Sequence, residues 1–197
     1  MQRAEMTVGG AWVFSPTVHG DARGSFHEWY RADLLDEVSG GGFAPHSPVI
    51  AQANCSVSRA GSLRGIHFAQ VPPGQAKYVT CFAGAVLDVV VDLRTGSPTY
   101  GVWDSVLLDD VDRRCVYVPE GLGHAFVALA DGSLVSYLVS TGYDPAREHG
   151  IDPFDPEIGI TWPTQDRDGR PLELTLSDKD RAAPSLSEAR ARGLLPA

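Results

Sequence analysis

The chain has 197 residues, 43% of them apolar, and its formal net charge is -9. This length and apolar content predict a single globular domain over residues 1–197. The acidic balance argues against nucleic acid and against an anionic membrane surface as the main partner, because both favour a basic protein face. A phosphorylated small molecule stays compatible, since it requires only a local cationic pocket.

Cysteine usage and the first residues favour a soluble protein of the cytoplasm. Cys55, Cys81 and Cys115 lack the Cys-x-x-Cys spacing of zinc sites, and we expect them to be reduced thiols. The start of the chain, MQRAEMTVGGAW, contains no apolar core of a secretion signal. No later stretch approaches the ~18 apolar residues that span a bilayer. We therefore expect no membrane partner.

Two short helices and a series of strands are predicted along the chain. Residues 30–42, YRADLLDEVSGGG, fit one short helix that ends at the glycines. Across residues 49–139, short β-forming runs alternate with Gly, Pro, Asp and Ser, a pattern typical of an antiparallel sandwich or barrel. A second helix is predicted within residues 185–195, SLSEARARGLL, with Ser185 or Ser187 as its N-cap.

The segment VLDVVVDLR, residues 86–94, predicts a strand with two distinct faces. Alternation places Asp88, Val90 and Asp92 on one face and Val89 and its alternate neighbours on the other. An acidic side chain on such a strand usually points to solvent, whereas in a small barrel the same face can line a polar cavity. Both interpretations stay open for the two aspartates.

His67, in GSLRGIHFAQ, has three interpretations: a metal ligand, a packed core histidine or a base. Metal-binding cupin barrels typically carry His-x-His followed by Glu, and a later His. Here the second histidine of the motif is Ala69, and His124 of PEGLGH is the one further candidate ligand. Two ligands are fewer than the three or four that a stable site requires, so we expect no bound metal.

Three other candidates are cationic. On an ideal strand Arg64 and His67 face opposite sides, but a bulge at Gly65 would bring both to one site. In DARGSFHEWY, residues 21–30, an arginine beside an aromatic residue fits either a grip on phosphate and base or a solvated loop. Lys77 lies between apolar residues of a predicted strand, where it faces either solvent or a cavity.

Seven segments follow one another in an order that resembles one enzyme family. They are DARGSFHEW, QANCSVSRAGSLRGIHFAQ, GQAKYV, DVVVDLRTGSPTYGVW, VPEGLGHAF, GIDPFDPEIGITWP and LSDKD. Over nearly its full length the chain resembles the dTDP-4-dehydrorhamnose 3,5-epimerase family of metal-free cupins. The resemblance implies an all-β cupin or jelly-roll barrel with a few short helices, one near the C-terminus, together with no cofactor and assembly as a homodimer.

The same resemblance implies roles for site residues. His67 would be the general base, Asp180 its partner, Tyr137 the acid, and Lys77 a cation beside the reacting sugar. Further residues would bind the substrate, and these are Arg23, Phe26, Glu28, Gln52, Asn54, Arg64, His124 and Tyr143. The chain departs from the family's usual pattern at His19, where an aromatic residue is common, so the preferred nucleotide base stays open.

The implied reaction is epimerisation of a dTDP-4-keto-6-deoxyhexose at C3, C5 or both, in the biosynthesis of rhamnose-type or secondary-metabolite sugars. Protons on C3 and C5 are acidic because each is α to the C4 carbonyl, and an imidazole can accept one near neutral pH. Return of a proton on the opposite face inverts the centre. Alternatives are a mono-epimerase for C3 or C5, a non-catalytic sugar-nucleotide-binding cupin, and a ketoisomerase acting between C3 and C4.

Overall fold

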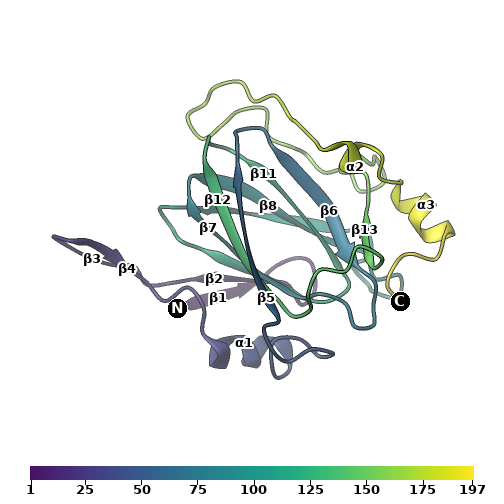
Figure 1. Ribbon diagram of the computed structural model, residues 1–197, viewed down its shortest axis with the longest axis horizontal. Coiled ribbons are helices and arrows are strands. Elements are labelled where there is room, and N and C mark those ends of the chain that lie inside the picture. Colours follow the sequence, from purple (N-terminus) through teal and green to yellow (C-terminus); the bar gives the residue numbers. More distant parts are fainter.

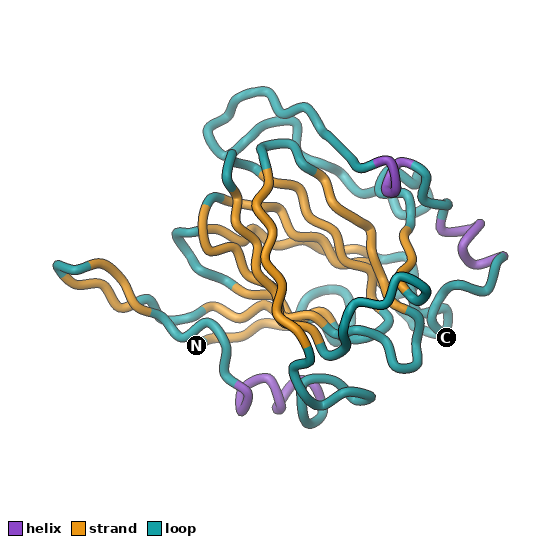
Figure 2. The backbone as a smooth tube through the Cα atoms, in the orientation of Figure 1, coloured by secondary structure: helices purple, strands orange, loops and turns teal.

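The computed structural model describes residues 1–197 and consists mainly of two antiparallel sheets packed face to face (Figures 1 and 2). The first sheet has the strand order β1 (Gln2–Glu5), β2 (Trp12–Ser15), β10 (Cys115–Val118), β7 (Lys77–Ala83), β12 (Ser133–Val139) and β5 (Gln52–Ser58). The second has the order β13 (Glu148–Gly150), β6 (Leu63–Ala69), β11 (Leu122–Ala128), β8 (Ala85–Asp92) and β9 (Trp103–Asp109). This arrangement confirms the predicted all-β jelly-roll barrel.

A separate hairpin projects away from the barrel. It consists of β3 (His19–Asp21) and β4 (Gly24–Phe26), which pair with each other and with neither of the two main sheets. Figure 1 shows it extending beyond the first sheet, on the side of β1 and β2. Every residue of the hairpin is exposed.

Three short helices lie outside the sheets. The helix α1 (Ala32–Ser39) ends at Gly40, whose φ of 84° confirms the predicted glycine stop. The helix α3 (Leu186–Ala191) begins after Ser185, which forms a capping box with Glu188 and is therefore the N-cap. The helix α2 (Asp178–Arg181) was not predicted. None of these helices has the length and apolar character needed to cross a membrane.

Both faces of β8 are buried, which excludes the solvent-facing interpretation of its aspartates. Val86 and Val90 pack between the two sheets, while Val89 packs beneath the C-terminal segment. Asp88 and Asp92 have no exposed surface. The usual expectation, that an acidic side chain on a strand points to solvent, is therefore wrong for both of them.

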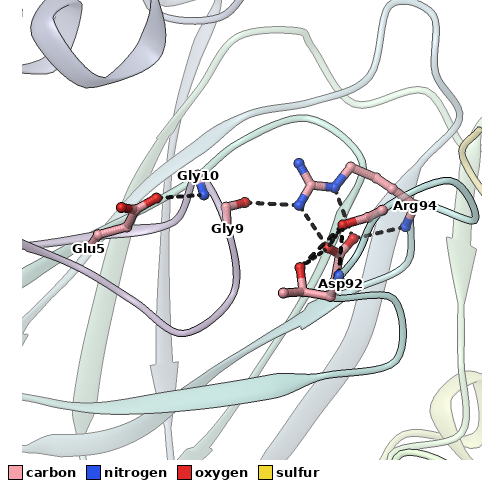
Figure 3. Close-up of polar contacts among 7 residues, drawn as sticks. Glu5, Gly9, Gly10, Asp92 and Arg94 are labelled. Carbon is pink, nitrogen blue, oxygen red and sulfur yellow. Dashed lines mark hydrogen bonds and ion pairs between the residues drawn. The ribbon is translucent and has the colours of Figure 1, made fainter.

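Asp92 is the centre of a buried polar network at one end of β8 (Figure 3). The guanidinium of Arg94 donates to both carboxylate oxygens at 2.9 and 2.8 Å, and the hydroxyls of Ser97 and Thr99 donate to Oδ2 at 2.5 and 2.6 Å. Burial raises the pKa of Asp92, but these hydrogen bonds outweigh it, and the pKa lies below its usual value. Arg94 also donates to the carbonyl of Gly9 at 2.8 Å, which fastens the β1–β2 turn to the second sheet.

Candidate active site

A cavity of about 420 Å³ opens between the two sheets and is closed on one side by α2. The four predicted catalytic residues, His67, Lys77, Tyr137 and Asp180, all line it. They come from β6, β7, β12 and α2, so that the two sheets and a C-terminal helix each contribute. The fold thus brings the predicted catalytic set to one place.

The pair of His67 and Asp180 is the most specific contact in this cavity. Nε2 of His67 lies 2.7 Å from Oδ1 of Asp180, although the two residues are 113 positions apart in the chain. Burial raises the pKa of Asp180, but the hydrogen bond and charge of His67, with smaller contributions from Ser177 and Gly65, hold that pKa below its usual value. The carboxylate fixes one ring nitrogen, which leaves Nδ1 of His67 as the nitrogen available to a substrate.

A bulge brings Arg64 and His67 to the same cavity, as predicted. In the ladder between β6 and β11, His67 pairs with His124 and Arg64 pairs with Phe126, so three steps along β6 match two steps along β11. Gly65 within this bulge has φ of 114°, and a Cβ there would lie 2.6 Å from the carbonyl oxygen of His124. A glycine is therefore required at this close approach of two strands.

Lys77 is buried and Tyr137 is half-buried. Burial lowers the pKa of Lys77, and the negative charge of Glu148 opposes this shift. Burial and the charge of Glu148 raise the pKa of Tyr137, while Arg64 acts in the opposite direction. Lys77, Tyr137 and His67 also line a second hollow of about 160 Å³ that includes Glu148, so this hollow adjoins the main cavity.

Three of the residues predicted to bind the substrate form a connected group at this second hollow. The amide nitrogen of Gln52 donates to Oδ1 of Asn54 at 2.6 Å, and Oε1 of Gln52 accepts from the backbone N–H of Tyr143 at 3.2 Å. Asn54 and the largely exposed Tyr143 line the hollow directly. These side chains are well placed to extend the binding surface beyond the catalytic residues.

Arg23, Phe26 and Glu28 line neither the catalytic cavity nor the second hollow of their own chain. Arg23 pairs with Asp21 at 2.6 Å on the projecting hairpin, and 66% of Phe26 is exposed. Glu28 follows the hairpin and lies 3.9 Å from Arg31. The hollow beside Arg23 and Phe26 shares no residue with the catalytic cavity.

Three charged residues near the site, Lys179, Glu148 and Asp88, were not among the predicted site residues. Lys179 lines both hollows, Glu148 lies beside Lys77, and Oδ2 of Asp88 lies 2.8 Å from Nε2 of the pocket residue His124. Lys179 had a detectable signal, since it is the second of two lysines and lies inside LSDKD. No group of three or more His, Cys, Asp and Glu side chains is arranged to hold a metal ion.

These side chains suit one kind of chemistry. An imidazole oriented by a carboxylate can remove a proton from carbon, a buried lysine can stabilise the resulting negative charge, and a tyrosine facing the imidazole from the other sheet can return a proton. The fold and the site therefore define a proton-transferring isomerase on a jelly-roll barrel.

Comparison with known proteins gives the family. The family model for dTDP-4-dehydrorhamnose 3,5-epimerase matches residues 5–188, and the chain belongs to this family. The dTDP-4-dehydrorhamnose 3,5-epimerase of Mycobacterium tuberculosis H37Rv is 56% identical over 196 residues, which cover 100% of this chain and 93% of the relative. These matches confirm the predicted family and enzyme class.

Two solved structures extend the comparison to the fold. An epimerase of Mycobacterium tuberculosis matches with a TM-score of 0.92 and 54% identity, over 100% of this chain and 94% of the other. A 3'-monoepimerase from Streptomyces bikiniensis in complex with dTDP-quinovose matches with a TM-score of 0.87 and 47% identity, over 96% and 90% of the two chains. Epimerases, among them a 3'-monoepimerase, therefore share this fold.

Proposed function

We propose that the protein inverts C3, C5 or both in a dTDP-4-keto-6-deoxyhexose, as a step in deoxysugar biosynthesis. The observation that carries this proposal is the 2.7 Å contact between His67 and Asp180 in a cavity that Tyr137 and Lys77 also line. The names of relatives support the substrate class, since one is a dTDP-4-dehydrorhamnose 3,5-epimerase and another was solved with dTDP-quinovose.

The first step is removal of a proton from the carbon next to the C4 carbonyl. His67 accepts it on Nδ1, because Nε2 is engaged with Asp180. The carboxylate of Asp180 has a lowered pKa, stays ionised near neutral pH, and stabilises the imidazolium that forms. The electron pair of the broken C–H bond moves into the C–C bond and onto the C4 oxygen.

Lys77 stabilises the charge that develops on that oxygen. Its ammonium group is buried and therefore acts in a medium where water screens poorly, which strengthens its interaction with an oxyanion. The carboxylate of Glu148 favours the protonated lysine, which offsets part of the effect of burial. Loss of one such donor typically lowers the rate by about 10²-fold to 10³-fold.

Reprotonation from the opposite face completes the inversion. His67 projects from β6 of the second sheet and Tyr137 from β12 of the first, and both line the cavity between them. A sugar held between the two sheets would present one face to the base and the other to the tyrosine hydroxyl. Tyr137 is an acid suited to this step because its raised pKa keeps it protonated until the enolate needs a proton.

Solvent deuterium exchange tests the proposal. Incubation of the purified protein with dTDP-4-keto-6-deoxyglucose in D2O, followed by NMR, is expected to show deuterium at C3, C5 or both. Label at both carbons indicates a double epimerase, and label at one carbon indicates a mono-epimerase. A shift of the carbonyl from C4 to C3 would instead identify a ketoisomerase.

Two variants make the test specific. His67→Asn removes the proposed base and is expected to abolish labelling. His46→Asn is the matched control, because His46 also contacts a carboxylate, that of Glu120, but lines none of the hollows of the site. Binding of the sugar nucleotide without any labelling by the wild-type protein would favour the non-catalytic alternative and overturn the proposed reaction.

We also propose that the protein is a homodimer in which the hairpin of one protomer reaches the cavity of the other. Arg23 and Phe26 are expected to bind the nucleotide, yet they lie on a hairpin that projects away from the barrel of their own chain (Figure 1). Two-fold symmetry would deliver each hairpin to the partner and bury the exposed ring of Phe26. In such an assembly Arg23 and Phe26 of one protomer would bind the nucleotide in the cavity of the partner.

We propose a cytoplasmic location as well. Cys81 and Cys115 are buried, Cys55 is exposed, and all three are free thiols, which fits a reducing compartment. Expression of the protein with a fluorescent tag, followed by cell fractionation, would test this location.

A further inference from the structure

The cavity contains a second histidine–carboxylate pair in addition to His67 and Asp180. Nε2 of His124 lies 2.8 Å from Oδ2 of Asp88. His124 is also the cross-strand partner of His67 in the ladder between β6 and β11. Cross-strand partners project from the same face of a sheet, and both imidazoles line the cavity. Two imidazoles, each held by its own carboxylate, therefore face the substrate space side by side.

Asp88 lies in surroundings that disfavour a negative charge. It has no exposed surface, and its strand face also carries Val86 and Val90, which pack inside the barrel. Oδ1 of Asp88 has no hydrogen-bond partner, and the side-chain partner of Oδ2 is the ring of His124. Burial raises the pKa of Asp88, and His124 opposes the shift. An ionised carboxylate without a compensating proton would be strongly unfavourable here.

The compensating proton must be held by Asp88 or by His124, and both placements leave a hydrogen on the same nitrogen of the ring. Either the carboxylic acid donates to Nε2 of a neutral imidazole, or an imidazolium donates its Nε2–H to the carboxylate. In both arrangements Nδ1 of His124 carries a hydrogen. Because Nε2 is engaged with Asp88, Nδ1 is the nitrogen that remains for a ligand in the cavity.

We infer that His124 donates a hydrogen bond from Nδ1 to the C4 oxygen of the substrate, and that Asp88 is the positioning residue that keeps the hydrogen on that nitrogen. The identity of the acceptor oxygen rests on the proposed function. In this role His124 and Lys77 act together on the oxyanion, as two donors that line one cavity.

The two pairs then have complementary roles that follow from their environments. The side chain of His67 is 36% exposed and the pKa of Asp180 is lowered, so this pair holds an ionised carboxylate and a ring nitrogen free to accept a proton. The side chain of His124 is 9% exposed and Asp88 is fully buried, so that pair retains its proton and donates. When the surroundings of two acid–base pairs shift their pKa values in opposite directions, one pair can act as a base and the other as a donor.

The hydrogen on Nδ1 can be observed without substrate. Protein labelled with ¹⁵N-histidine is examined at neutral pH by NMR that correlates ring nitrogens with ring carbon-bound protons, and His124→Gln assigns the signals. We expect a protonated Nδ1 at His124. A bare Nδ1 there would overturn the inference whatever the reaction is, so this measurement does not depend on the proposed function.

Kinetics with Asp88→Val test the consequence for catalysis. Valine suits a strand with valine neighbours and removes the buried carboxyl, so we expect the variant to fold with an unchanged or higher Tm. Its kcat for deuterium exchange should fall by about 10²-fold, with KM changed by less than about threefold, because the lost interaction strengthens as the oxyanion forms. Asp88→Asn should lose less, since an amide N–H can donate to Nε2 and keep the hydrogen on Nδ1.

A double-mutant cycle separates this role from a purely structural one. If Asp88 acts through His124, then Asp88→Val added to His124→Gln causes no further loss of kcat. Additive losses, or wild-type kcat in Asp88→Val, would overturn the inference. If the wild-type protein labels neither carbon, the proposed function fails, while the NMR measurement still decides whether His124 is a donor.

Discussion

Lys77 is a residue at which function and stability conflict. It lies almost wholly inside the protein, and burial lowers its pKa from the usual 10.5. Replacement by methionine keeps the length of the side chain but removes the charge that is unfavourable there. We expect Lys77→Met to lower the exchange rate by about 10²-fold or more and to raise Tm by roughly 2–4 °C for each kcal/mol gained.

The same lysine predicts a pH dependence that identifies the cause. Between the lowered pKa and 10.5, the unfolded chain binds more protons at this group than the folded chain, so wild-type stability gains as pH rises. The advantage of Lys77→Met should therefore be largest near neutral pH and shrink as pH approaches 10.5. Denaturant unfolding of both proteins across this range checks it, and a constant difference would mean that packing, and not charge, is responsible.

Tyr137 is expected to act after the proton has been removed. In Tyr137→Phe the base His67 and its partner Asp180 are untouched, so a proton can still exchange with solvent at an abstracted position. Inversion requires a donor on the other face and should fall more. The measurement compares deuterium incorporation with formation of the inverted sugar in the same NMR sample. Equal loss of the two would mean that the tyrosine is not simply the acid.

Individual site residues differ in how far the sequence identifies them. His67 is conspicuous in its motif, but local pattern leaves it as ligand, core residue or base, because its partner Asp180 lies 113 positions away. The bulge at Gly65 was predictable, since glycine in a strand is a local signal. The burial of Asp88 was not, because alternation shows that it shares a face with Val90 but not that a second sheet covers that face.

At the scale of single elements, local signals decide what can be predicted. The helices α1 and α3 were predicted because one ends at Gly40 and the other begins at a serine cap. The helix α2 has only four residues, too few for a periodic pattern, and it exists where it packs against β6. This smallest helix carries Asp180, so the catalytic pair depends on the element that sequence patterns reveal least.

Two serine caps offer a matched test of this dependence. The hydroxyl of Ser177 accepts from the backbone N–H of Asp180 at 3.1 Å, and that of Ser185 accepts from Glu188 at 3.2 Å. Replacing either serine by alanine should reduce the free energy of unfolding by about 1 kcal/mol. Only Ser177→Ala should also lower the exchange rate, because α2 positions the partner of His67. Equal rates in the two variants would show that packing alone positions Asp180.

At the scale of the whole molecule, the sequence predicted an antiparallel barrel but not the order of its strands. Short β-forming runs with turn residues between them are enough to indicate the class. The strand order joins β2 to β10 and β12 to β5, which lie far apart in the chain, and no local pattern contains that information. The cavity depends on this order, because it requires β7 and β12 of one sheet to face β6 and β11 of the other.

Mixed dimers test whether the complete site needs two chains. One parent carries Arg23→Ala and Phe26→Ala in the hairpin and keeps His67, and the other carries His67→Asn and keeps the hairpin. If each hairpin serves the partner's cavity, each parent alone should be nearly inactive. In a mixed dimer, however, one cavity combines an intact base with an intact hairpin. Random exchange of subunits makes about half of the dimers mixed, each with one complete site, so activity should recover to about a quarter of the wild-type level.

The mixture is prepared by unfolding and refolding the two parents together, and the deuterium exchange assay gives its activity. Parents refolded separately and then combined are the control, and they should stay inactive while subunits do not exchange. Sedimentation should show a dimer in every sample. A monomer, or a refolded mixture no more active than the control, would mean that the hairpin acts within its own chain or does not contribute to the site.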